Sequence, residues 1–147
     1  MSLATNKSYA GDLSAQRCYD ALQASDAILI DVRTKAEWAF VGVPDLAEIG
    51  GTPIFLEWQI YPEMNLNSQF VDTLSTELNK RTLGFDTPLY FLCRSGVRSA
   101  SAAAAMTKSG YRQCFNVSGG FEGPANDSRH RGQTDGWKAS DLPWFQS

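Results

Sequence analysis

A cysteine lies between an apolar run and a run of alanines in the stretch FLCRSGVRSASAAAA, residues 91–105. The apolar residues 89–93 are typical of a buried strand, and residues 97–109 are typical of a helix that ends at Gly110. The N-terminus of such a helix directs unpaired N–H groups and a positive dipole end toward Cys93. These surroundings favour the thiolate, which is the nucleophilic form of cysteine.

Two arginines and a glycine add to this chemistry. Arg94 and Arg98 bring two permanent positive charges, and each charge favours the thiolate. Gly96 permits backbone conformations that are closed to other residues, so that the amides of residues 94–99 can point inward at an anion. We therefore predict that Cys93 is a nucleophile held in a cradle for negative charge.

The elements that position this loop alternate along the chain. Apolar runs predict buried strands at residues 27–32, 53–58, 89–93 and 113–117. Helices are predicted at residues 12–24 with Asp12 as N-cap, after Thr34 with a Thr34–Glu37 capping box, at 67–81 and at 97–109. This alternation predicts an α/β fold with a mostly parallel central sheet of about five strands and helices on both faces. Ligands of such sheets bind at the carboxyl ends of the strands, where Cys93 lies.

The chain is predicted to form one domain with a short segment on either side. Residues 1–11 are interpreted as a flexible lead-in, residues 12–124 as the domain, and residues 125–147 as an extension packed on or beside it. Four apolar residues are candidates to hold the extension against the domain: Trp137, Leu142, Trp144 and Phe145.

Composition excludes several classes of function. The formal net charge of −3 speaks against a nucleic-acid partner. No window approaches the ~18 apolar residues needed to span a membrane, and the N-terminus carries no apolar signal segment. Three cysteines and one histidine, His130, do not form a zinc-binding pattern, so we expect no metal and no cofactor. An odd number of cysteines without a signal segment favours the reducing cytoplasm. For the oligomeric state, we expect a monomer or a homodimer.

Three motifs resemble the rhodanese (sulfurtransferase) family. CRSGVR, residues 93–98, is similar to the active-site loop of that family. IDVRTKAEW, residues 30–38, is similar to its D-V-R-x-x-x-E-[FY] segment, and NVSGGF, residues 116–121, resembles its N-V-x-G-G motif. The motifs occur in the family's order between about residues 13 and 121, which identifies the chain as a rhodanese-like domain.

The resemblance implies a reaction and a role for each residue of the motifs. Cys93 would take a sulfur atom from a small anionic donor such as thiosulfate, carry it as a persulfide, and pass it to cyanide or a thiol, which a protein can supply. The donor and the persulfide would be bound by loop residues Arg94, Ser95, Gly96, Val97, Arg98 and Ser99. Asp31 and Arg33 would brace the loop from the neighbouring strand, or else form an ordinary ion pair.

Three alternatives remain open at this stage. Rhodanese-fold domains also include persulfide carriers and regulatory binding modules. Cysteine-based phosphatases and arsenate reductases use a C-x5-R loop, whereas here Arg98 is five positions after Cys93, so the loop is one residue shorter. A cysteine protease would need His130 as its base, and that residue is predicted to lie in an exposed polar loop.

Overall fold

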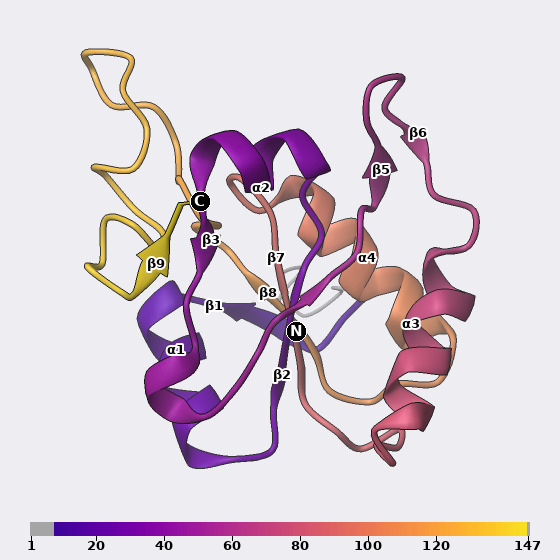
Figure 1. Ribbon diagram of the computed structural model, residues 1–147. Coiled ribbons are helices and arrows are strands. Elements are labelled where there is room, and N and C mark those ends of the chain that lie inside the picture. Colours follow the sequence, from indigo (N-terminus) through magenta and orange to yellow (C-terminus); the bar gives the residue numbers. More distant parts are fainter. Residues whose placement is uncertain (1–7, 147) are drawn as a thin grey trace, which may run out of the picture.

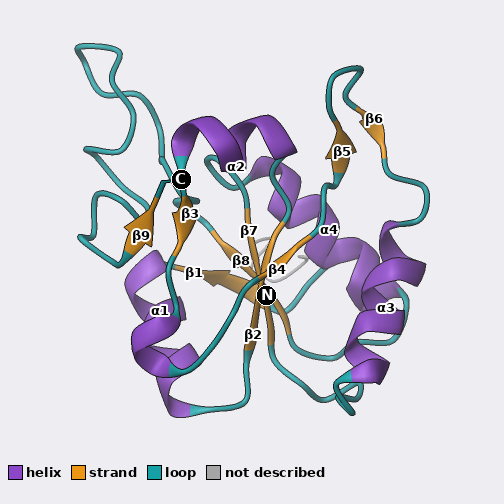
Figure 2. Ribbon diagram, in the orientation of Figure 1, coloured by secondary structure: helices purple, strands orange, loops and turns teal. Residues whose placement is uncertain are grey.

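Five parallel strands form the central sheet of the computed structural model, which describes residues 8–146. The order across the sheet is β1-β8-β7-β2-β4, shown as orange arrows in Figure 2. The strands are β1 (Gly11–Leu13), β2 (Ile28–Asp31), β4 (Ile54–Phe55), β7 (Leu89–Leu92) and β8 (Cys114–Val117). The predicted parallel sheet of about five strands is therefore confirmed.

Helices cover both faces of this sheet, as predicted (Figure 1). Helix α1 (Ala15–Ala24) buries Cys18 and Leu22 in a cluster with Leu29 and Leu92 on one face. Helices α3 (Phe70–Lys80) and α4 (Val97–Lys108) pack on the other face, in a cluster that contains the alternate strand residues Ile30, Leu89 and Phe91. Ala102 and Ala103 are fully buried there, so small side chains bring α4 close to the sheet.

Local signals at the helix ends were predicted with mixed success. The capping box of α2 (Lys35–Val41) is confirmed, because the Thr34 and Glu37 side chains and backbone amides bond reciprocally. The prediction that Asp12 caps the first helix is wrong. Ser14 is the N-cap, and its Oγ accepts a hydrogen bond from the amide of Arg17. Asp12 instead lies in β1, opposite Asn116 of β8.

Strand β1 was missed because only Leu13 of its three residues is strongly apolar. It begins at Gly11, so the predicted lead-in ends one residue too late. The rest of that predicted segment, residues 1–7, lies outside the described residues.

Two smaller antiparallel pairs stand beside the carboxyl ends of the sheet (Figure 1). One is a hairpin of β5 (Gln59–Ile60) and β6 (Asn65–Leu66). The other joins β3 (Val43–Pro44) to β9 (Trp144–Phe145), near the end of the chain, and the single-turn helix η2 (Ala47–Ile49) follows β3.

The extension after residue 124 is packed against the domain through some of its predicted anchors. Trp137 and Leu142 are buried in the same cluster as α1, whereas Trp144 and Phe145 form β9 and stay about half exposed. Among the described residues, no helix is both long and apolar enough to cross a membrane.

Candidate active site

Cys93 is the first residue after β7, and its sulfur is almost completely buried. Two donors surround the sulfur. The amide of Gly96 lies 3.1 Å from Sγ, and the hydroxyl of Ser99 lies 3.1 Å from the same atom. Gly96 has a φ of 113° and immediately precedes α4, so its amide belongs to the N-terminus of that helix. Of the predicted cradle, the Gly96 amide and the Ser99 side chain thus contact the thiol directly.

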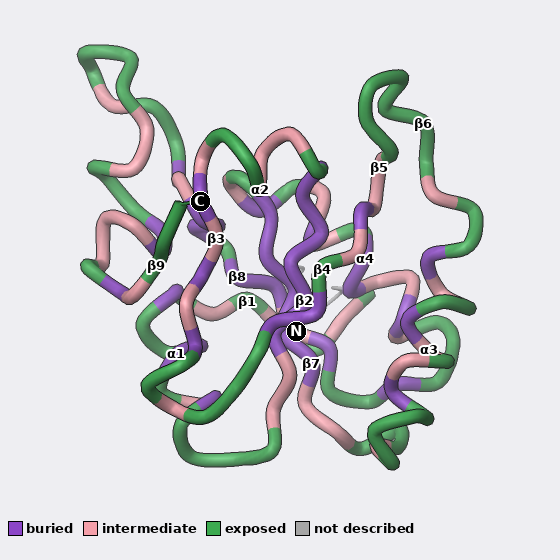
Figure 3. Tube along the Cα trace, in the orientation of Figure 1, coloured by how far each residue is buried: buried purple, intermediate pink, exposed green. Residues whose placement is uncertain are grey.

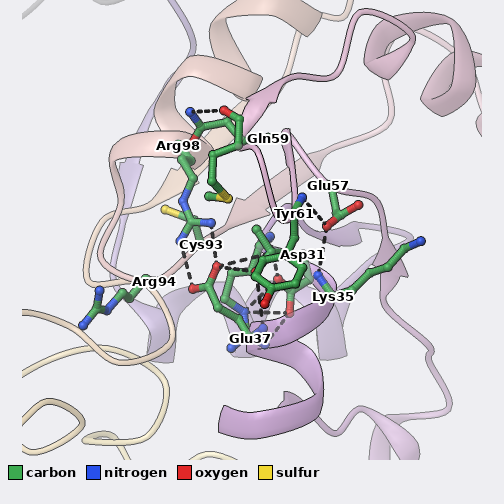
Figure 4. A network of polar contacts seen from close by, with 12 residues as sticks. Asp31, Lys35, Glu37, Glu57, Gln59, Tyr61, Cys93, Arg94 and Arg98 are labelled. Carbon is green, nitrogen blue, oxygen red and sulfur yellow. Dashed lines mark hydrogen bonds and ion pairs between the residues drawn. The ribbon is translucent and has the colours of Figure 1, made fainter.

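The two loop arginines differ in their surroundings (Figure 4). Arg98 forms a two-pronged ion pair with Glu37 of α2, with distances of 2.7 and 2.9 Å. Arg94 is half exposed, points away from this pair, and approaches Glu122 only to 3.7 Å. One predicted anion-binding guanidinium is therefore already bound to a carboxylate, and the other is accessible.

The Arg98–Glu37 pair shifts the protonation equilibria of both partners toward the charged forms. Partial burial alone would raise the pKa of Glu37, but the hydrogen bonds and charge from Arg98 and the Thr34 bonds lower it overall. Burial alone would lower the pKa of Arg98, but Glu37, with the charges of Cys93 and Asp31, raises it overall. The pair is short and mostly shielded from water, so it holds the end of the loop against α2.

Residues 116–123 hold the backbone of the Cys93 loop, residues 93–99. The carbonyl of Cys93 accepts a bond from the amide of Phe121, and the carbonyl of Arg94 accepts bonds from those of Glu122 and Gly123. A side chain at Gly120 would place its Cβ 2.5 Å from the Arg94 carbonyl oxygen, and one at Gly96 would lie 2.5 Å from the Ser118 carbonyl oxygen. Both glycines also have positive φ, so this close approach of the two segments requires glycine.

Asp31 and Arg33 form a buried ion pair with each other rather than with the loop. The Arg33 Nη2 atom lies 2.7 Å from Asp31 Oδ2 and also donates to the carbonyl of Gly42. The guanidinium lies 4.2 Å from the centre of the Phe121 ring. The pair is linked to the loop through Phe121, whose ring contacts Arg33 and whose amide donates to the Cys93 carbonyl.

A chain of polar side chains leads from the sulfur to the sheet edge. Ser99 Oγ lies 2.5 Å from Asn116 Oδ1, and Asn116 Nδ2 donates to Asp12 Oδ1 over 3.0 Å. Ser99 and Asn116 are buried, and strands β1 and β8 place Asp12 and Asn116 opposite each other.

The other predicted residues occupy varied positions. Ser95 is half buried, and Val97 is 76% exposed at the start of α4. His130 lies exposed in the extension. Burial raises the pKa of the Cys18 and Cys114 thiols, which fits their prediction as core residues.

Three residues of this site were not predicted to have a role here. Glu37 was recognised only as a helix cap, Asn116 only as a letter of a motif, and Glu122 was not considered. The motifs around residues 30–38 and 116–121 marked the positions of Glu37 and Asn116, but they did not indicate the distant partners Arg98 and Ser99.

Comparison with known proteins identifies the family. A family profile described as STR4 middle domain matches residues 10–147. The chain belongs to this rhodanese-like family. The resemblance noted from the three motifs is thus confirmed at the level of the fold, which the STR4 middle domain family shares with other rhodanese-like proteins.

Known relatives match this chain over most of its length. An uncharacterized protein of Rickettsia conorii is 40% identical over 134 residues, which is 90% of this chain and 95% of the relative. The crystal structure of Rv0390 from M. tuberculosis is similar with a TM-score of 0.83 and 40% identity, covering 95% of this chain and 99% of that one. The thiosulfate sulfurtransferase GlpE of Actinobacillus succinogenes is 28% identical over 76% of this chain and 81% of its own.

Proposed function

We propose that this protein is a sulfurtransferase that carries sulfane sulfur as a persulfide on Cys93. The observation that carries the proposal is the pair of donors, the Gly96 amide and the Ser99 hydroxyl, 3.1 Å from a sulfur atom at a helix N-terminus. Donors aimed at one atom stabilise negative charge there. The likeness to a protein named thiosulfate sulfurtransferase supports the same chemistry.

The reaction has two steps. In the first, the Cys93 thiolate attacks the outer sulfur of thiosulfate, a new S–S bond forms, the old one breaks, and sulfite leaves with the electron pair. In the second, cyanide or a thiolate attacks the outer sulfur of the persulfide, and the Cys93 thiolate leaves. Each step exchanges one bond to sulfur for another, so no redox partner is needed.

The two arginines take different parts in this proposal. Arg94 is the accessible cation of the loop, so we assign it to the oxygens of the incoming donor. The guanidinium of Arg98 is bound to Glu37, so we assign Arg98 to holding the shape of the loop and to stabilising negative charge at the sulfur. Replacement of Arg94 by glutamine should then raise the KM for thiosulfate more than it lowers kcat.

Intact-protein mass spectrometry after incubation with thiosulfate tests the proposal. The wild-type protein should gain the mass of one sulfur atom and lose it on addition of cyanide. Cys93→Ser should gain nothing, whereas the matched variant Cys114→Ala, which alters a buried thiol of the core, should load like wild type. A wild-type protein that stays unloaded, or that hydrolyses an aryl phosphate through Cys93, contradicts it.

A further inference from the structure

We propose that Asn116 is a positioning residue that sets the charge on the Cys93 sulfur by competing for the single hydroxyl hydrogen of Ser99. This inference rests on the proposed sulfur transfer, because the charge on that sulfur changes in each step. Ser99 itself contacts the reacting atom, whereas Asn116 acts through Ser99.

The competition follows from a count of hydrogens. A serine hydroxyl has one hydrogen to donate, yet the Ser99 oxygen lies within bonding distance of two acceptors. These are Cys93 Sγ at 3.1 Å and Asn116 Oδ1 at 2.5 Å. The hydroxyl can serve one of them fully at any moment, and the shorter distance favours Asn116.

Asp12 fixes which end of the Asn116 amide faces Ser99. The Asn116 Nδ2 group donates to Asp12 Oδ1, and an ionised carboxylate only accepts hydrogen bonds. The amide oxygen must therefore face Ser99, where it accepts the hydroxyl hydrogen. With its hydrogen turned toward Asn116, Ser99 no longer donates to Cys93 Sγ, and the Gly96 amide is then the donor at the sulfur.

The direction of the Ser99 hydroxyl depends on the chemical state of the sulfur. In the thiol and in the persulfide, Cys93 Sγ is uncharged, and the Ser99 hydroxyl donates its hydrogen bond to Asn116 Oδ1. When Cys93 becomes a thiolate, or leaves as one as the acceptor takes the outer sulfur, the hydroxyl rotates and donates to Sγ. Asn116 Oδ1 then loses its partner, and this loss opposes the thiolate.

Two substitutions should therefore act in opposite directions. Ser99→Ala removes the donor that the thiolate uses, so alkylation of Cys93 at neutral pH should slow about tenfold, because a bond to a charged atom is worth roughly that factor. Asn116→Ala removes the competing acceptor, so alkylation should become faster by about threefold to tenfold, and its pH profile should move to lower pH. Ser99→Thr keeps the hydroxyl and should restore most of the wild-type rate.

The charged groups around the sulfur stay in place in these variants. They are Arg94 and Arg98 of the loop, Glu37 from α2 and Asp31 from β2, with Asp12 of β1 behind Asn116. Asp12→Asn is a milder change at an exposed position, should Asn116→Ala fail to fold. The substitution allows the side-chain amide of Asn116 to turn, so alkylation of Cys93 should become about twofold faster. The acceleration should persist in 0.5 M salt, where the effect of losing the Asp12 charge is screened.

The experiment measures alkylation of Cys93 from pH 5 to 9, and the rate at which cyanide removes sulfur from preloaded protein. Support requires that Ser99→Ala slows both rates and that Asn116→Ala, or Asp12→Asn in its place, speeds alkylation without slowing unloading. A purely structural role would slow both variants alike, and that result, or an unchanged profile, overturns the inference. If wild type alkylates as expected but never gains sulfur, the proposed function fails and this competition does not.

Discussion

The extension after residue 124 and the hairpin β5–β6 stand at opposite sides of the view in Figure 3, and they differ in how they are held. The extension after residue 124 bonds to residues 116–123, which support the Cys93 loop, since the amides of Trp137 and Lys138 donate to the carbonyls of Gly120 and Phe121. The hairpin β5–β6 is fixed at its base through Glu57, but its strands expose Ile60 and Leu66. In Figure 3 the hairpin beyond β5 is green, whereas the extension, although also largely green and pink, has short purple stretches where it is buried.

This contrast teaches that segments outside the motifs have separate tasks. Lys138 provides a further link between the extension and the domain. Its Nζ donates a hydrogen bond to the carbonyl of Val41 and lies 4.0 Å from the centre of the Trp144 ring. The extension therefore belongs to the structure that shapes the loop. The hairpin contributes little to the core, and its apolar residues Ile60 and Leu66 are exposed.

Trp137→Ala, which tests whether the extension is part of the core, should have the largest effect on stability. The ring is fully buried, meets Tyr19 edge-on at 5.7 Å and donates from Nε1 to the carbonyl of Pro143. Its loss should lower the free energy of unfolding by about 3–5 kcal/mol, measured by urea denaturation. Trp137→Phe keeps most of the volume and should cost less than half as much. A loss below 1 kcal/mol for the alanine variant would show that the extension is not part of the core.

Gly120→Ala tests the support of the loop backbone alone. The added Cβ would lie 2.5 Å from the Arg94 carbonyl oxygen, at a residue with φ of 64°. We expect a loss of about 2 kcal/mol or more in the free energy of unfolding, together with slower alkylation of Cys93. Gly11→Ala is the control, because its Cβ would meet nothing within 4 Å. Equal effects for the two glycines would contradict the role of the close approach.

Glu37→Gln removes the ion pair with Arg98, a support of the loop that comes from neither the extension nor the hairpin. The free energy of unfolding should fall by about 1–2 kcal/mol at pH 7, because the glutamine offers Arg98 a poorer hydrogen-bond acceptor. The pKa of Glu37 is lowered on folding, so the ion pair stabilises the fold above the unfolded carboxyl pKa of about 4.3 and loses this effect as pH falls through the lower folded value.

The difference in unfolding free energy between wild type and Glu37→Gln should thus be constant from pH 7 to about 5 and shrink in more acidic solution. Glu77→Gln removes a partner from the exposed Arg81 pair and should cost less than about 0.5 kcal/mol. A wild-type advantage that grows on acidification would reverse the assigned sign.

Leu66→Ser on the hairpin should have the smallest effect. Its side chain is 64% exposed, so the free energy of unfolding should change by less than about 0.5 kcal/mol. The matched variant Leu142→Ser, at a buried position of the extension, should cost more than about 2 kcal/mol. Similar losses in thermal or urea unfolding would mean that the hairpin is a structural element after all.

The sequence was sufficient where the signal was local. The strands that end at Asp31 and Leu92, the Thr34–Glu37 box and the helix that ends before Gly110 follow from runs, caps and periodicity. The predicted strand at 53–58 was less accurate, since only Ile54–Phe55 pairs with β2. The apolar run is thus longer than the strand, which lies at the edge of the sheet with β2 as its partner.

Distant pairing lay beyond the sequence. Glu37 and Arg98 are 61 residues apart, and each has an ordinary local interpretation as a cap or as a loop cation. Their union changes the expected chemistry, because a guanidinium that binds a carboxylate is no longer a free anion receptor. The hydroxyl chain from Ser99 to Asp12 is similar, since it forms only when β1 pairs with β8.

The pairing of β1 with β8 has a consequence for how the protein is made. Gly11 aligns with Phe115, so β1, the first strand of this sheet along the chain, must wait for β8, its last strand. Until residues 114–123 have emerged, the Cys93 loop lacks the backbone hydrogen bonds from residues 121–123, and Ser99 lacks its partner Asn116. The described surroundings of Cys93 therefore form only once the last strand of the sheet is available, rather than growing as the polypeptide lengthens.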